Sequence, residues 1–175
     1  MKPIRLLAFP LLLVAVLSSC VISVGDSSVL NFLSVHDGSV SVHARSGPDA
    51  TITAAGDLTI DGKPVATTTE QQALLKQYYD QALAIRAEGV TTGVAAASLA
   101  HKAVSNVATG LAHGNSDSIG PRIEAEAKTV KAQAMKVCDA VAELRTTQDA
   151  LVASLPAFKP YALIDANQAA DCRSE

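Results

Sequence analysis

The chain has 175 residues, of which 49% are hydrophobic, 18% charged and 3% aromatic, and its formal net charge is −3. This length fits one domain after N-terminal processing, and the hydrophobic content excludes a fully disordered chain. Scarce aromatic residues and a negative charge argue against a surface that stacks bases or binds phosphates, so we expect no nucleic-acid partner. After the first twenty residues the sequence has no strongly apolar stretch of 18 residues, which excludes a protein with several membrane-spanning helices.

The first twenty residues have the pattern of a bacterial export signal. Lys2 and Arg5 give a short positive segment, and the apolar residues 6–17 that follow are too few to span a bilayer of about 30 Å. The next residues, Leu17-Ser18-Ser19-Cys20, resemble the lipobox of bacterial lipoproteins. In that family the peptide is cleaved before the cysteine. The resemblance therefore implies a signal peptide at 1–19 and a Cys20 that carries diacylglycerol on its thiol and an acyl chain such as palmitate on its new amino group.

The alternative interpretation of this segment is an ordinary secretory peptide with a cysteine nearby. Val21 follows the cysteine, and in lipoproteins of enteric type a residue other than Asp at this position implies the outer membrane. Each buried CH₂ group contributes about 0.8 kcal/mol, so several acyl chains anchor a protein far more durably than one. We therefore expect an outer-membrane lipid anchor and a body that faces the periplasm.

Lipidation of Cys20 leaves two cysteines, Cys138 and Cys172, in an oxidising compartment. An even remainder favours one disulfide between them, and closing a loop of that length stabilises a fold by about 3–4 kcal/mol in the chain-entropy model. Two prolines beyond residue 155 predict a turn after the last long helix, which lets the C-terminal tail run back toward Cys138. The alternative is a buried free Cys138 and a reactive Cys172.

Residues 28–66 have the chemistry of short antiparallel strands. Asp37-Gly38 lies between two segments of strand-forming residues and predicts a two-residue type I′ hairpin turn. That turn predicts two apolar cross-strand pairs on one face, Val35 with Val40 and Leu33 with Val42. Further turns are predicted at Gly47-Pro48-Asp49, Gly56-Asp57 and Asp61-Gly62. The resulting meander has too little apolar area to be stable alone, so it must pack on the rest of the chain.

From Thr67 onward the hydrophobic period becomes helical. Thr67 and Glu70 have the spacing of a capping box, and apolar residues then recur at alternating steps of four and three as far as Ile85. A second stripe is predicted in the Ala-rich stretch that ends near residue 112, with members Val90, Val94, Ala97, His101, Val104, Ala108 and Leu111. Gly89 and Gly93 lie at the junction, and the sequence leaves open whether they bend or break the helix.

The last long helix is predicted for about residues 121–155, with Pro121 at its first position. Its seam resembles that of a coiled coil over about five heptads, weakened by small side chains and one glutamine. The seam residues are Ile123, Ala127, Val130, Ala134, Val137, Val141, Leu144, Gln148, Leu151 and Leu155. Antiparallel packing of the two helical stretches would bury both seams against each other.

We therefore expect an α+β fold, in which a small N-terminal antiparallel β-meander packs on a long antiparallel α-helical hairpin or a three-helix arrangement. The expected segments are a signal peptide at 1–19, a tether at 20–27, the β-meander at 28–66, the helical hairpin at 67–155 and a C-terminal tail at 156–175.

The sequence contains no convergent set of catalytic residues. Gly25-Asp26-Ser27 superficially resembles the nucleophile block of GDSL-type hydrolases, but those enzymes also need an Asp three residues before a His, and no His here has one. In the predicted hairpin His36 and His43 lie about 13 Å apart along the strand, too far to bind one ion. His101 and His113 are about three helical turns apart and fail likewise. We expect no catalytic residue, no metal and no cofactor.

Three further features carry a family resemblance. The strand–turn run Val42–Val65 leads directly into a helix at Thr69–Glu88, Glu88-Gly89 opens the next helix, and Val137-Cys138-Asp139 precedes Leu144–Leu155. In these features the chain resembles the YggN-like family of proteobacterial periplasmic proteins, a domain of unknown function. The resemblance implies export and a layout of strands followed by helices, and it transfers no catalytic residue.

These observations favour a non-catalytic envelope protein with a structural or protein-interaction role. Its expected partners are the membrane, through the acyl chains on Cys20, and either a second copy or another envelope protein. The alternative function is a carrier that holds a lipid or another apolar ligand between the sheet and the helices.

Overall fold

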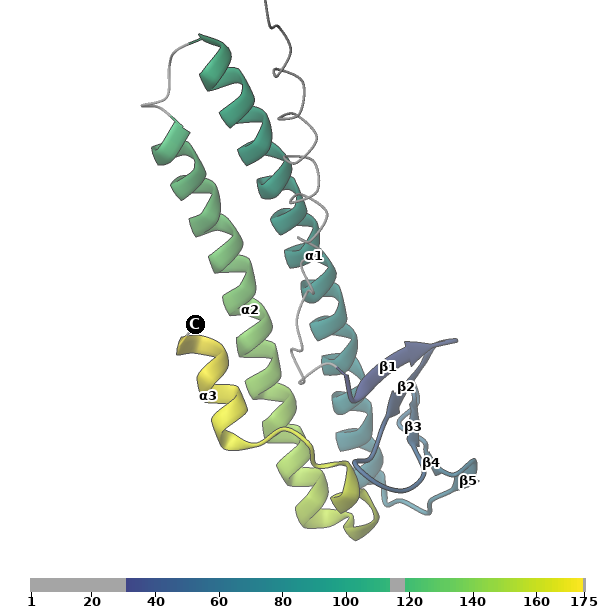
Figure 1. Cartoon of the computed structure of the whole chain (residues 1–175). Coiled ribbons are helices and arrows are strands. Elements are labelled where there is room, and N and C mark those ends of the chain that lie inside the picture. Colours follow the sequence, from purple (N-terminus) through teal and green to yellow (C-terminus); the bar gives the residue numbers. More distant parts are fainter. Residues whose placement is uncertain (1–30, 114–118, 175) are drawn as a thin grey trace, which may run out of the picture.

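The computed structural model describes residues 31–113 and 119–174 (Figure 1). Five short strands come first: β1 (Leu33–His36), β2 (Ser39–Val42), β3 (Ala50–Thr53), β4 (Leu58–Ile60) and β5 (Lys63–Pro64). The helices follow: α1 (Thr69–His113), α2 (Ile119–Ser154), the 3₁₀ helix η2 (Pro156–Tyr161) and α3 (Ala166–Ser174). The predicted α+β class is confirmed, with the sheet beside one end of a long antiparallel pair of helices (Figure 1).

The sheet is an antiparallel meander in the order β1-β2-β3-β4-β5. Asp37 and Gly38 have φ angles of 48° and 73°, the positive values that a type I′ turn requires at both central positions. The turn sets the register, and both predicted pairs, Val35 with Val40 and Leu33 with Val42, are confirmed. Val40, Val42, Ile52 and Leu58 are buried on the face toward the helices.

The capping box of α1 lies one residue later than predicted. The Thr68 N–H donates to Gln71 Oε1 at 2.9 Å, and the Gln71 N–H donates to Thr68 Oγ1 at 3.3 Å. The Gln71 side-chain amide also donates to the carbonyl of Ser154, where α2 ends, at 2.6 Å. Because this contact fixes Gln71 at the third helical position, Thr68 caps the helix in place of Thr67.

The first half of α1 decides which face of the whole helix meets α2, because α1 continues as one helix through Gly89 and Gly93. Leu75, Tyr78, Ala82 and Ile85 are buried in the core. At about 100° per residue the same side continues through the half-buried residues Thr92, Ala95, Leu99 and Ala103.

The second predicted stripe of α1 therefore does not pack on α2, and that expectation is wrong. Val94 lies nine residues after Ile85, which places it about 180° around the helix from the core side. The side chains of Val90, Val94 and Val104 are 61%, 66% and 73% exposed. Because α1 does not break at Gly89 or Gly93, the orientation of its first half also determines which residues of its second half face α2.

The predicted seam of α2 is buried from Val141 to Leu155 and only partly covered in its first half, where Ala127 is exposed. Gln148 is 1% exposed and bonds both polar groups of the Ile164 backbone: its Nε2 donates to the carbonyl at 2.9 Å, and the Ile164 N–H donates to its Oε1 at 3.0 Å. The one glutamine of the seam thus holds the chain segment between η2 and α3 against α2.

Aromatic side chains close the core where sheet and helices meet. Phe158 of η2 is fully buried and contacts Tyr78 of α1 edge to face, with 5.3 Å between ring centroids. The Tyr79 hydroxyl donates to the Gly38 carbonyl at 3.0 Å, and the Tyr161 hydroxyl donates to the Pro48 carbonyl at 2.9 Å. These two bonds fix the hairpin turn and the β2–β3 loop to the helices. Within residues 31–113 and 119–174, neither long helix has an 18-residue window apolar enough to cross a membrane.

Candidate functional site

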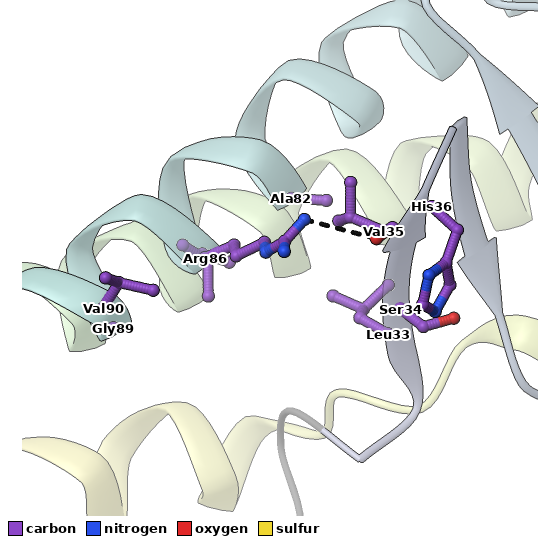
Figure 2. A pocket seen from close by; sticks show the side chains of 9 residues that line it. Leu33, Ser34, Val35, His36, Ala82, Arg86, Gly89 and Val90 are labelled. Carbon is purple, nitrogen blue, oxygen red and sulfur yellow. Dashed lines mark hydrogen bonds between the residues drawn. The ribbon is translucent and has the colours of Figure 1, made fainter. Parts of the chain in front are cut away.

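A largely apolar groove of about 410 Å³ lies between β1 and the middle of α1 (Figure 2). Its apolar walls are Leu33 and Val35 of β1 and Ala82, Ile85 and Val90 of α1. Leu33 points from β1 toward the helix, whereas Ser34 and His36 project from the other side of the strand (Figure 2). The groove is therefore a place where an apolar group can lie between sheet and helix.

The same groove runs along an edge of the sheet, because β1 is the first strand in the order of the strands within the described residues. The His43 N–H donates to the Phe32 carbonyl at 2.8 Å, and the alternation of an antiparallel ladder then turns the backbone groups of Leu33 and Val35 away from β2. Arg86 Nη1 donates to the Val35 carbonyl at 3.2 Å and covers that edge group (Figure 2). Covering an edge strand in this way limits unspecific strand pairing.

The groove opens onto the outward face of α1 at Val90. We name the exposed residues of this face the outer stripe; they are Val90, Val94, Ala97, His101 and Val104. The stripe is about 21 Å long at 1.5 Å per residue. Residues 89–101 contain no Asp, Glu, Lys or Arg, so most of this solvent-facing helix surface carries no formal charge.

Three side chains at the sheet form a chain of hydrogen bonds that sequence reasoning missed. Ser34 Oγ lies 3.0 Å from His43 Nε2, and His43 Nδ1 lies 2.8 Å from Asp49 Oδ2. With the proton on Nδ1, the imidazole donates to Asp49 and accepts from the Ser34 hydroxyl. This order of contacts is that of a hydrolase triad. The signal was present in the hairpin register, which places Ser34 diagonally from His43 on the face away from the core.

Other features of this trio favour a bracing role over acyl transfer. The His43 and Asp49 side chains are 41% and 51% exposed, so water reaches both. Ser34 pairs with Ser41 at a hydrogen-bonded position of the ladder, which occupies the Ser34 N–H that an oxyanion would need. The contacts instead tie the loop between β2 and β3 to β1.

The cysteines and histidines singled out in the sequence fall at separate places. Cys138 of α2 and Cys172 of α3 form a disulfide with 5.6 Å between their Cα atoms, so the tail does return to the hairpin. Cys20 and Ser27 lie outside the described residues. His36 borders the groove, and His101 is exposed on the outer stripe. The described part of the chain brings no three His, Cys, Asp or Glu side chains together in a way that could hold a metal ion.

A model of the family described as "Protein of unknown function (DUF2884)" matches residues 27–120, which is more than half of the chain. The chain belongs to this family. The DUF2884 match covers the sheet and α1, and with them every residue of the groove and the outer stripe, whereas the disulfide lies beyond it. No curated protein and no solved structure matches the chain.

Proposed function

We propose that this DUF2884 protein is a lipid-anchored component of the bacterial outer membrane that faces the periplasm and acts by binding another macromolecule. The anchor is Cys20, exposed as the new N-terminus after removal of residues 1–19. The lipobox pattern Leu17-Ser18-Ser19-Cys20 supports the anchor, and the resemblance to YggN-like periplasmic proteins supports export.

The disulfide supports the same compartment. Disulfides persist in the periplasm and are rare in the cytosol of mesophilic bacteria. Of the three cysteines, Cys138 and Cys172 are paired, and acylation of Cys20 leaves no free thiol. A mature chain without free thiols suits an oxidising compartment.

The outer stripe is the observation that carries the interaction role. Its three valines are more than half exposed and lie on one side of α1, and residues 89–101, which include two of them, contain no charged residue. A contiguous exposed apolar patch on a folded protein often marks an interaction site, whereas single scattered apolar side chains do not. We propose no catalytic role, because the Ser34–His43–Asp49 trio is open to water and its serine N–H is engaged in the sheet.

Metabolic labelling tests the anchor. Cells that express the full chain would be grown with radioactive palmitate beside cells that express Cys20→Ser, a change of one sulfur atom for oxygen. We expect label and outer-membrane fractionation for the first protein and neither for the second. Equal labelling of both proteins, or of neither, would refute the anchor.

Affinity capture tests the interaction role. The tagged full chain would be recovered from detergent-solubilised envelopes, beside a Val94→Glu variant that places a charge in the outer stripe. A protein that co-purifies with the parent chain and is lost from the variant supports binding through this surface. Recovery of a strict monomer from both strains would contradict it.

The groove favours a second candidate function, that of a carrier for a lipid or another apolar molecule. A volume of about 410 Å³ is within the range of small-ligand pockets, and its walls are mostly apolar. Native mass spectrometry of protein purified from envelopes would detect a bound lipid. A bulky side chain in the groove, Val90→Trp, should remove the added mass, while Val104→Trp, which lies outside the groove, should retain it. An empty parent protein would refute the carrier.

A further inference from the structure

We propose that the outer stripe of α1 pairs with the same stripe of a second copy, antiparallel, about a two-fold axis beside Ala97. The proposal rests on the interaction role proposed above and names its partner. The two helices would form a short antiparallel coiled coil that leaves the α1–α2 packing of each copy intact.

The stripe is complementary to itself when reversed. Val90 and Val104 lie seven residues before and after Ala97, so reversal about Ala97 places Val90 of one copy opposite Val104 of the other. Val94 lies three residues before Ala97 and His101 four after it, so Val94 of one copy comes within one residue of His101 of the other. Steps of four and three form the seam of a coiled coil, and a two-fold contact uses one patch twice.

Charge does not oppose this pairing. The stretch 89–101, which forms the centre of the contact, has no formal charge. Lys102 follows it, but its Nζ lies 3.3 Å from a carboxylate oxygen of Glu126 on α2, so this ammonium group is held on the side away from the stripe. A second copy therefore brings no like charges against each other at the centre of the stripe.

The proposed pairing also brings the partner helix close to the groove. With the axis beside Ala97, the end of the partner's α1 runs antiparallel past residues 81–89, where Ala82, Ile85 and Val90 form one wall of the groove. The partner helix would thus pass Val90, the residue that the outer stripe shares with the groove.

The contact area predicts a reversible dimer. The outer stripe is about 21 Å long at 1.5 Å per residue, and a helix is about 10 Å wide. The strip is thus about 200 Å² on each copy and about 400 Å² in total, which is smaller than stable interfaces and indicates a weak contact in solution. Anchoring both copies in one membrane raises their effective concentration. A two-fold axis that also lies along the membrane normal would place both anchors at the same height, as two anchors in one membrane require.

Site-directed cross-linking in envelopes of cells that express the full chain tests the pairing. In the proposed dimer, Ala97→Cys places the thiols of the two copies side by side at the two-fold axis. Their Cα atoms would then lie within the distance of about 6 Å that a disulfide needs. Ala132→Cys is the matched control. This exposed alanine lies on α2 at nearly the same level, because the Lys102–Glu126 contact sets the antiparallel register of the two helices. After mild oxidation we expect a band of twice the chain mass for Ala97→Cys at least fivefold stronger than for Ala132→Cys or for the parent chain.

A second pair of variants tests the direction of the helices. Cells that express both Val90→Cys and Val104→Cys should give at least fivefold more cross-linked dimer than cells that express either alone. Strong self-linking of Val90→Cys would show a parallel arrangement and overturn the proposal, as would equal bands for Ala97→Cys and Ala132→Cys or no band at all. A band at another mass would mean that a different envelope protein covers the stripe. That result would overturn the second copy as the occupant while leaving the proposed interaction role in place.

Discussion

At the scale of single residues, several polar side chains acquire a meaning that the sequence pattern does not reveal. Gln148 weakens the predicted coiled-coil seam, yet in the structure it satisfies both backbone groups of Ile164. Gln133, on the same helix, has a buried Oε1 for which the described part of the chain provides no hydrogen-bond partner. The two glutamines therefore respond in opposite ways to substitution by an apolar residue.

We expect Gln148→Leu to destabilise the protein by about 2–4 kcal/mol, because it leaves the buried N–H and carbonyl of Ile164 without partners. Gln133→Leu, the matched control, should be neutral or stabilising. Urea unfolding followed by circular dichroism measures both. A Gln148→Leu variant at least as stable as the parent would show that the hydrogen bonds to Ile164 are dispensable.

Tyr78 predicts a dependence of stability on alkaline pH. Its hydroxyl is buried, and no hydrogen-bond partner for it lies within the described residues; burial raises the pKa of this phenol. Since an unfolded tyrosine ionises near pH 10, the unfolded state loses its proton first and the free energy of unfolding falls as the pH rises above that value. Tyr161 adds to the same trend, because burial and then Asp49 and Asp61 raise its pKa.

Tyr78→Phe should therefore weaken the loss of stability above pH 10 and change stability at pH 7 by less than about 1 kcal/mol. Tyr79→Phe is the control, since it removes the bond to the Gly38 carbonyl and should cost about 1 kcal/mol at pH 7. Unfolding midpoints between pH 7 and 11 provide the measurement. An unchanged alkaline slope in Tyr78→Phe would assign the effect to other groups.

At the scale of elements, the sequence predicted the features that depend only on neighbouring residues, such as the register of the first hairpin. Asp37-Gly38 predicted the hairpin register, because a two-residue turn with two positive φ angles leaves one pairing. The side of α1 that meets α2 was predicted wrongly. That side depends on whether the helix continues through Gly89, and tertiary packing of the first half decides it. The Ser34–His43–Asp49 trio was missed because Asp49 comes from a loop whose path follows from no local pattern.

The disulfide predicts how α3 is held. Cys138 and Cys172 are separated by 34 residues, a loop for which the chain-entropy model gives a stabilisation of about 4 kcal/mol. A double Cys138→Ala, Cys172→Ala variant should lose up to that amount and expose the α3 amides to rapid hydrogen exchange, while Gln148 still holds Ile164. Protection of α3 equal to that of the parent protein would show that packing alone retains it.

The trio at the sheet predicts bracing without nucleophilic reactivity. We expect no labelling of Ser34 by a fluorophosphonate probe. We also expect His43→Ala to speed hydrogen exchange in the loop of residues 44–49, because His43 links Asp49 of this loop to Ser34 of β1. Ser34→Ala should have a smaller effect, since the His43–Asp49 contact remains. Stoichiometric labelling that Ser34→Ala abolishes would identify a nucleophile and contradict the non-catalytic interpretation.

At the scale of the whole molecule, the core lies at one end and the apolar surface at the other. Sheet, α1, α2 and η2 meet around Tyr78 and Phe158, whereas the far halves of the two long helices cover each other on one side only (Figure 1). The α+β layout was predictable because the hydrophobic period changes near residue 67. What covers the outer stripe was not, since a helix pattern does not distinguish an internal contact from one between molecules.

One measurement tests the proposed anchor, compartment and disulfide together: the intact mass of the protein extracted from the outer membrane. We predict a chain that begins at Cys20, carries the added mass of diacylglycerol and a further acyl chain, and is lighter by two hydrogens than its reduced form because of the Cys138–Cys172 bond. Recovery of the complete chain from Met1, with an unmodified Cys20 and two free thiols, would contradict all three together.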